Sequence, residues 1–141
     1  MFLPDEAATL AAGAKLSAGL VAGDLVELHG PLGAGKTTLV RGILQARGWH
    51  GAVRSPSFNL LSLYDLEPPV AHLDLYRIES PEGLGLEDLL DTHIVLIEWP
   101  KGLDELAAEE SIWRVEILPA EPHGRQLQIT PPSGRIIPAL S

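Results

Sequence analysis

The spacing of hydrophobic residues changes several times along the chain, and each change marks a predicted element. Alternating or continuous apolar residues predict strands, whereas apolar residues three and four positions apart predict helices. The predicted strands are residues 24–29, 58–65, 70–77, 93–97, 111–118 and 125–130. The predicted helices are residues 4–21, 36–48, 80–90 and 103–110. These elements predict one α/β domain, residues 1–141, with the proline-rich residues 131–141 as a loose tail.

The strands differ in how much of each is expected to be buried. Residues 93–97 form an almost continuous apolar run, which is typical of a central parallel strand covered on both faces. Residues 111–118 alternate apolar and charged side chains, which predicts one solvated face. The connection between 58–65 and 70–77 is too short for a crossover helix, so these strands are expected to pair antiparallel. In the first helix, Ala7, Leu10, Ala14 and Val21 are predicted to form the apolar face.

A glycine-rich stretch, Gly30-Pro31-Leu32-Gly33-Ala34-Gly35-Lys36-Thr37, lies between a predicted strand and a predicted helix. Its spacing matches the phosphate-binding loop, in which backbone amides and the helix N-terminus surround an anion. Lys36 is expected to reach the outer phosphates and Thr37 to hold a magnesium ion. A plain glycine turn that caps a helix does not need both of these side chains. The expected cofactor-binding residues are Gly33, Ala34, Gly35, Lys36, Thr37, Thr38 and Ser55.

This motif refines the expected architecture. We predict a P-loop NTPase-like three-layer sandwich with a mostly parallel central sheet and an antiparallel C-terminal hairpin.

Two carboxylates are candidates to complete such a site. Glu98 directly follows the buried run 94–97, at the carboxyl edge where ligands bind in open α/β sheets. Asp74 lies on one strand face with His72 and Tyr76, a pattern that a half-solvated edge strand would also show. The residues alone favour Glu98 as a site carboxylate, whereas both interpretations of Asp74 stay open at this point.

Other residues near these carboxylates have two interpretations each. Trp99 either shields the site or packs in the core, and residues 55–57 form either a switch-like loop that senses phosphate or a Ser/Pro-rich turn.

Composition narrows the classes of function. The 141 residues contain no cysteine, which excludes disulfides and thiolate metal sites. No apolar run approaches the roughly 18 residues of a membrane span, and the first residues lack signal-peptide features, so a cytoplasmic protein is expected. The net charge of −9 argues against a surface that tracks nucleic acid, so a partner is expected to hold any RNA.

Several motifs together resemble the TsaE (formerly YjeE) family. They are the glycine loop, Ser55-Pro56-Ser57-Phe58, His72-Leu73-Asp74-Leu75-Tyr76-Arg77, Gly85-Leu86-Glu87-Asp88 and Ile97-Glu98-Trp99-Pro100. Ser57 is a departure, because the family usually has Thr there. The resemblance implies a magnesium-dependent ATPase that binds the TsaB–TsaD heterodimer and supports its turnover in tRNA threonylcarbamoyladenosine modification. It also implies that Thr37, Glu98 and Asp74 serve the magnesium ion, and that Asp74 and Glu98 act in catalysis with Trp99 beside the hydrolysis site. Ser55 to Phe58 would be the switch-like loop, and tRNA would be contacted only through the complex.

Other functions remain open at this stage. A small nucleotide or metabolite kinase would use the same loop, although the chain shows only one lysine after the loop, Lys101, and no arginine-rich lid. A GTP-binding switch is disfavoured because no Asn-Lys-x-Asp stretch is present. A non-enzymatic subunit with a structural nucleotide is the fourth possibility.

Overall fold

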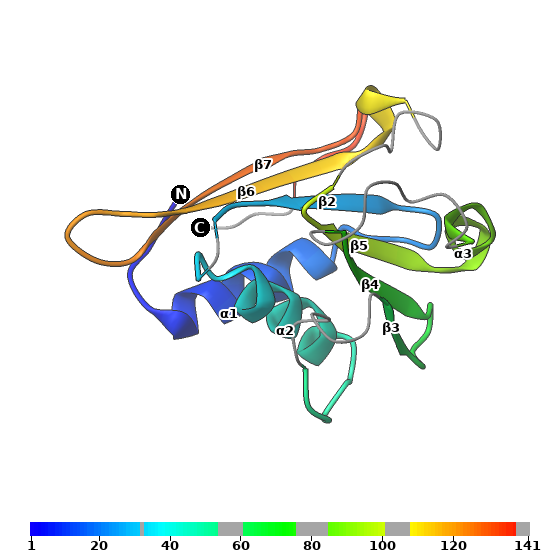
Figure 1. Ribbon diagram of the computed structural model, residues 1–141, viewed down its shortest axis with the longest axis horizontal. Helices are drawn as coiled ribbons and strands as arrows, with labels where there is room; N and C mark the ends of the chain where they lie inside the picture. The colour runs from blue at the N-terminus through cyan, green and yellow to red at the C-terminus, as the bar shows by residue number, and fades with distance from the viewer. Residues whose placement is uncertain (32, 54–60, 76–84, 101–107, 138–141) are drawn as a thin grey trace.

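The computed structural model describes residues 1–31, 33–53, 61–75, 85–100 and 108–137. Within these residues, seven strands form one mixed sheet (Figure 1). Its order is β1 (Phe2–Leu3), β7 (Arg125–Thr130), β6 (Trp113–Pro119), β2 (Leu25–His29), β5 (Ile94–Glu98), β4 (Val70–Asp74) and β3 (Leu61–Tyr64). The central strands β6, β2, β5 and β4 run parallel, and the outer strands pair antiparallel. The predicted mostly parallel centre and C-terminal hairpin are both confirmed.

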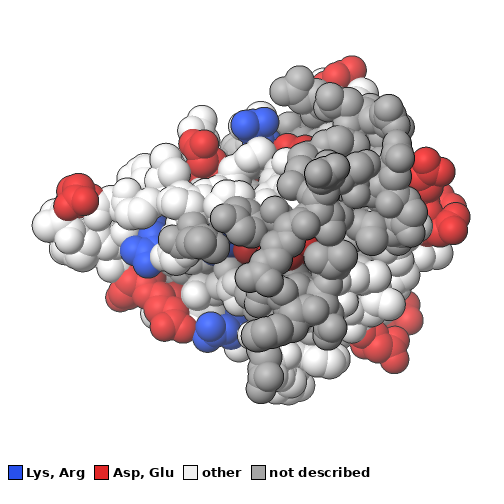
Figure 2. Space-filling view, in the orientation of Figure 1, with Lys and Arg blue, Asp and Glu red and all other residues white. Residues whose placement is uncertain are grey.

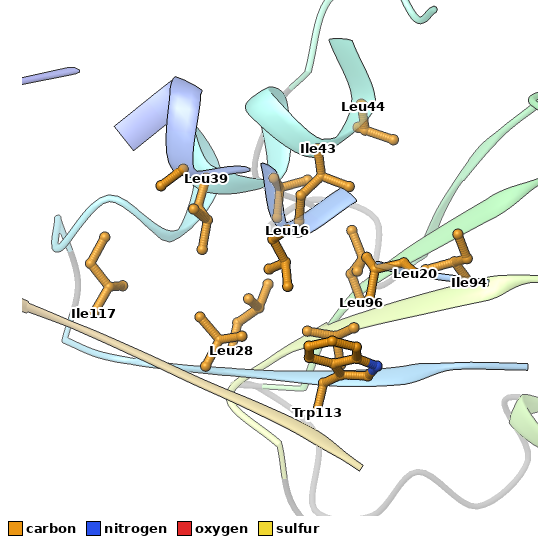
Figure 3. Packing of buried hydrophobic residues seen from close by; sticks show 14 of the residues in the cluster. Leu16, Leu20, Leu28, Leu39, Ile43, Leu44, Ile94, Leu96, Trp113 and Ile117 are labelled. Carbon is orange, nitrogen blue, oxygen red and sulfur yellow. The ribbon is translucent and has the colours of Figure 1, made fainter. Parts of the chain in front are cut away.

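Helices on the two faces of the sheet complete the layers. Helices α1 (Glu6–Ser17) and α2 (Lys36–Ala46) lie side by side below the sheet in Figure 1. Their side chains, including Leu16, Leu39 and Ile43, point toward Leu28 and Trp113 of the strands (Figure 3). Each such side chain contributes roughly 1.5–3 kcal/mol when it is fully buried. Helix α3 (Leu86–Thr92) packs through Leu86 on the opposite face, together with the alternate residues of β4 and β5.

The predicted apolar face of the first helix is partly wrong, although Leu10 and Ala14 are half-buried. Ala7 and Val21 are exposed, and the buried face is instead Thr9, Ala12, Gly13, Leu16 and Ser17. The reason is the neighbouring helix: a Cβ at Gly13 would collide with the Leu39 carbonyl oxygen of α2. Glycine is therefore placed here to let two backbones approach, and it does not break the helix.

The bounds of α1 and the C-terminal end of α3 also differ from the prediction. Helix α1 begins after Asp5, whose side chain accepts a hydrogen bond of 2.8 Å from the Ala8 amide, and it ends at Ser17 rather than Val21. Helix α3 runs from Leu86 to Thr92, and residues 80–84 of the predicted helix lie outside the described residues. Most of the predicted helix 103–110 also lies outside them, and a short 3₁₀ turn covers Glu109–Ser111.

Both ends of the described chain are held more firmly than expected. Phe2–Leu3 forms an unpredicted edge strand that pairs with β7. The tail was predicted to be loose, but Arg135 donates hydrogen bonds of 2.9 and 3.0 Å to the Asp24 carboxylate. It also donates one of 2.7 Å to the Gly19 carbonyl oxygen. These contacts connect the described part of the tail to the segment between α1 and β2, and the order of residues 131–141 as a whole stays a prediction. Among the described helices, none combines the length and apolar character that crossing a bilayer requires.

Candidate functional site

The glycine loop connects β2 to α2, as the sequence predicts. Its shape depends on contacts with α2 and with β6. Gly35 is the N-cap of α2 in a left-handed conformation with φ +108°, which favours glycine. A side chain at Gly30 would collide with the Ile117 carbonyl oxygen of β6. Thr37 and Thr38 lie half-buried in the first turn of α2. The positive end of the helix dipole and the free amides of this turn therefore meet at the loop, where an anion is stabilised.

Lys36 is nearly enclosed by the loop and its surroundings. Its side chain is 5% exposed, and its Nζ donates a hydrogen bond of 2.5 Å to the Gly30 carbonyl oxygen. The same Nζ lies 3.6 Å from the ring centroid of Trp99, a cation–π contact. Burial lowers the pKa of Lys36 from its usual value, and attraction to Glu98 and Asp74 partly opposes this effect. The ammonium group is thus a buried cation that feels the negative charge of two nearby carboxylates.

Asp74 and Glu98 lie opposite each other at the carboxyl ends of two adjacent parallel strands, β4 and β5. Both are buried, at 9% and 3% exposed respectively. Side chains alternate along a strand, and Leu96, two residues before Glu98, packs in the cluster that α1 and α2 cover. Glu98 therefore points to the same face of the sheet as the glycine loop. Asp74 does so as well, because Val70, four residues before it, packs in that cluster.

A buried histidine holds one of these carboxylates. His72 is fully buried, and its Nε2 lies 2.6 Å from Oε2 of Glu98. Its other nitrogen, Nδ1, has no hydrogen-bond partner among the described residues. The sequence placed His72 near the site, but the contact with Glu98 depends on strand register and was not predicted. An imidazole in this position restricts the rotamers of Glu98 and leaves its second oxygen for another ligand.

Trp99 comes next in the chain and has a strained backbone. Its φ is +55°, the left-handed region that bulky residues rarely adopt. This conformation turns the chain after β5 and places the indole against Lys36. Such strain persists where the surroundings enforce it, often at functional sites. The indole therefore contacts the lysine of the candidate site, and the role of Trp99 there stays a prediction.

Some expected site residues cannot be placed. Ser55 and the whole predicted switch-like loop 55–58 lie outside the described residues, as do Leu32, Tyr76 and Arg77. Conversely, the sequence analysis missed Arg125, whose Nη2 donates a hydrogen bond of 3.1 Å to the Gly33 carbonyl oxygen of the loop. No local motif marks Arg125, because β7 reaches the loop only through the order of strands in the sheet.

The donor set fits magnesium. Mg²⁺ usually binds one or two carboxylates and completes its shell with water and substrate phosphates. Asp74 and Glu98 supply the carboxylates beside a phosphate-binding loop, and Thr37 supplies a hydroxyl in the first turn of α2.

On the face that Figure 2 draws, the described Lys and Arg residues do not gather in one area. Blue Lys and Arg atoms occur there in separate places, whereas red Asp and Glu atoms recur around the outline. The net charge of −9 agrees with this distribution.

Comparison with known proteins agrees with this geometry. The sequence profile described as "Threonylcarbamoyl adenosine biosynthesis protein TsaE" matches residues 3–127. The tRNA threonylcarbamoyladenosine biosynthesis protein TsaE of Haemophilus influenzae is 42% identical over 108 residues, 70% of this chain and 68% of the relative. The Nostoc protein of the same name is 37% identical and covers 93% of this chain and 85% of the relative.

A solved structure supports the fold as well. The crystal structure of Bacillus subtilis YdiB superposes with a TM-score of 0.79 at 26% sequence identity, and the match covers 94% of this chain and 84% of that one. The profile match extends over most of the chain, and the relatives exceed 30% identity over about two thirds or more of both lengths. This chain therefore belongs to the TsaE family.

Proposed function

We propose that the protein binds and hydrolyses ATP with magnesium to support turnover of the TsaB–TsaD complex in tRNA threonylcarbamoyladenosine modification. One observation carries the ATPase part of this proposal. A buried lysine in a phosphate-binding loop lies within the electrostatic reach of two buried carboxylates on adjacent strand ends. Burying three ionisable groups together is costly unless a ligand uses them, so the arrangement favours a site for a metal–phosphate complex.

Each residue has a distinct proposed role in that site. The amides from Gly33 to Thr38 and the Lys36 ammonium bind the phosphates, and Lys36 would leave the Gly30 carbonyl oxygen to do so. Thr37, Asp74 and Glu98 would hold the magnesium ion, which neutralises charge that develops on the phosphates. One of the two carboxylates would also orient the attacking water. Trp99 would limit the access of bulk water to Lys36.

The role in tRNA modification rests on family membership. The relatives carry the name tRNA threonylcarbamoyladenosine biosynthesis protein TsaE, and the profile covers residues 3–127 of this chain. The net charge of −9 supports a division of labour in which TsaB and TsaD hold the tRNA and this protein contributes the ATP cycle. We expect the role in the cytoplasm, where tRNA is modified.

Reconstitution tests this function directly. Threonylcarbamoylation by TsaB and TsaD would be followed over many turnovers with the wild-type protein, without it, and with Lys36→Ala. We expect multiple turnover only with the wild-type protein. Lys15→Ala, a lysine in the last turn of α1, is the matched control and should behave as wild type. Equal turnover without the protein would refute the proposal, and transfer of phosphate to a small acceptor would identify a kinase instead.

A further inference from the structure

Two groups cover the Lys36 ammonium, one from the main chain and one from a side chain. Nζ donates a hydrogen bond of 2.5 Å to the Gly30 carbonyl oxygen, and it lies 3.6 Å from the ring centroid of Trp99. Lys36 as a whole is only 5% exposed. Little of the ammonium is therefore open to a phosphate oxygen, so a covering group must give way before phosphate and lysine can meet.

Of these two groups, the carbonyl of Gly30 has less room to move. Gly30 directly follows β2, which is paired with β5 on one side and with β6 on the other. Its backbone also lies close to β6, since a Cβ at Gly30 would be 2.3 Å from the Ile117 carbonyl oxygen. Trp99 instead follows the last residue of β5 and is half-buried. Rotation of the indole about its side-chain bonds is therefore the simplest way to uncover the ammonium.

The backbone of Trp99 favours a second position of the indole. Its φ of +55° is costly for a bulky residue, and such strain persists only where surrounding contacts enforce it. The contact with the ammonium is one that does so, because a cation removed from water binds an indole face more strongly than an exposed cation does. Burial also lowers the pKa of Lys36, which indicates that water solvates this ammonium incompletely. Backbone strain and cation–π attraction thus oppose each other, and this balance allows two positions of the ring.

We propose that the Trp99 indole and the outer phosphates of the nucleotide compete for the Lys36 ammonium. The ring covers Lys36 when the phosphates are absent, moves aside when they bind and returns as they leave, so that Trp99 promotes release of the nucleotide. The proposal rests on the proposed function, since it describes regulation of the same site. It predicts that removal of the ring strengthens nucleotide binding, because the phosphates then displace one contact fewer.

Affinity for Mg-ADP, measured by calorimetry for the wild type, Trp99→Phe and Trp99→Leu, tests this competition. All three side chains place a similar steric demand on φ, so the series changes mainly the ring. We expect Trp99→Leu to bind Mg-ADP roughly tenfold more tightly than the wild type does. Trp99→Phe should gain affinity to an intermediate extent, because a phenyl ring attracts cations less than an indole does.

Trp49 provides the matched control. It lies after the C-terminal end of α2, whereas Lys36 is the first residue of that helix, and its indole packs edge-on against Tyr64 with ring centroids 5.0 Å apart. Trp49→Leu should therefore bind Mg-ADP as the wild type does. A gain of affinity confined to the Trp99 variants cannot come from general damage to the fold, since damage would weaken binding. Equal gains in all three variants would overturn the proposal.

The failure of this proposal can be told apart from failure of the proposed function. Unchanged or weaker binding of Mg-ADP by Trp99→Leu would overturn the competition, and the proposed function would stand as long as the wild type hydrolyses ATP. Tighter binding by Trp99→Leu, in a protein whose wild type never hydrolyses ATP even with TsaB and TsaD, would support the competition and refute the ATPase.

The position of the ring can also be followed in the unsubstituted chain. The protein contains three tryptophans, so labelling with 5-fluorotryptophan gives three ¹⁹F signals, which Trp49→Phe and Trp99→Phe assign. Saturating Mg-ADP should shift the Trp99 signal, whereas the signal of Trp113, which is fully buried in the core, should stay in place. A Trp99 signal that does not move at saturation would contradict the proposal.

Discussion

His72 Nε2 lies 2.6 Å from Glu98 Oε2, and this contact joins two buried polar side chains of adjacent parallel strands. It restrains one oxygen of a proposed magnesium ligand. The preferred orientation of Glu98 is thus set before any ligand arrives, which reduces the reorganisation that binding requires.

Replacing His72 should therefore affect hydrolysis more than nucleotide affinity. We expect His72→Leu to lower kcat for ATP roughly tenfold, because Glu98 loses its partner, with a smaller change in KM. The unpaired buried carboxylate should also cost about 1–3 kcal/mol of unfolding free energy. His72→Gln keeps a donor and should recover part of kcat, and the exposed His50→Ala is the control. A wild-type kcat in His72→Leu would show that His72 only fills space.

The buried ammonium of Lys36 should make the ligand-free protein less stable than it could be. Because its pKa is lowered in the folded state, the folded protein binds this proton more weakly than the unfolded chain does. The cost is fully present below the lowered pKa and disappears as the pH rises above 10.5, the usual value of a lysine. We expect Lys36→Met to be more stable than wild type by roughly 1 kcal/mol at pH 7, although it should lose ATP binding.

Denaturant titrations of both proteins at neutral pH and near pH 10 test this expectation. The difference in unfolding free energy between Lys36→Met and wild type should shrink as the pH rises. A difference that is constant or grows with pH would mean that burial of the charge is not what destabilises the ligand-free protein.

The contact between α1 and α2 should depend on Gly13. Replacing glycine by alanine inside a helix normally stabilises by about 0.5–1 kcal/mol. Here the added Cβ would collide with the Leu39 carbonyl oxygen, so we expect Gly13→Ala to destabilise by about 1–3 kcal/mol. Ala7→Gly, at an exposed position of the same helix, measures the ordinary difference in helix propensity between alanine and glycine. Thermal unfolding of both variants gives the comparison, and a stabilised Gly13→Ala would contradict the packing.

The described part of the tail should be anchored by Arg135. Asp24 is buried, with 8% of its side chain accessible, and Arg135 is the cation that contacts both of its oxygens. We expect Arg135→Ala to cost about 2 kcal/mol of unfolding free energy and to expose the tail to limited proteolysis. Arg114→Ala should cost well under 1 kcal/mol of unfolding free energy. The Arg114 side chain is exposed, and its Nη1 lies 4.0 Å from Glu27 Oε1. Equal effects of the two substitutions would show that the tail contact contributes little.

Local signals account for what the sequence could predict. Three such signals each occupy a few consecutive residues: the glycine loop, the apolar run before Glu98 and the alternation around Asp74. The strands and the helix that contain them, and the edge of the sheet at which they lie, could therefore be predicted from the local pattern. The antiparallel pairing of β3 with β4 followed from the length of the connection.

The features that could not be predicted depend on contacts between distant residues. His72 meets Glu98 across 26 positions, and Arg125 meets Gly33 across 92. Neither contact can be predicted from the spacing of nearby residues, because each depends on strand order and register. The buried face of α1 was predicted incorrectly for a related reason. Alanines occur on several sides of this helix, so their spacing does not identify the buried face. That face is determined by the close approach of the α2 backbone to Gly13.

The central claim is that the site formed by Lys36, Asp74 and Glu98 hydrolyses ATP. The most direct test is the rate of phosphate release with Mg-ATP, alone and with TsaB and TsaD, for the wild type, Glu98→Gln and the exposed control Glu110→Gln. We predict hydrolysis by the wild type and the control that rises with the partners, and a loss of roughly 100-fold in Glu98→Gln with ATP binding retained. ATP that stays bound and intact on the wild type, even with both partners present, would contradict the account.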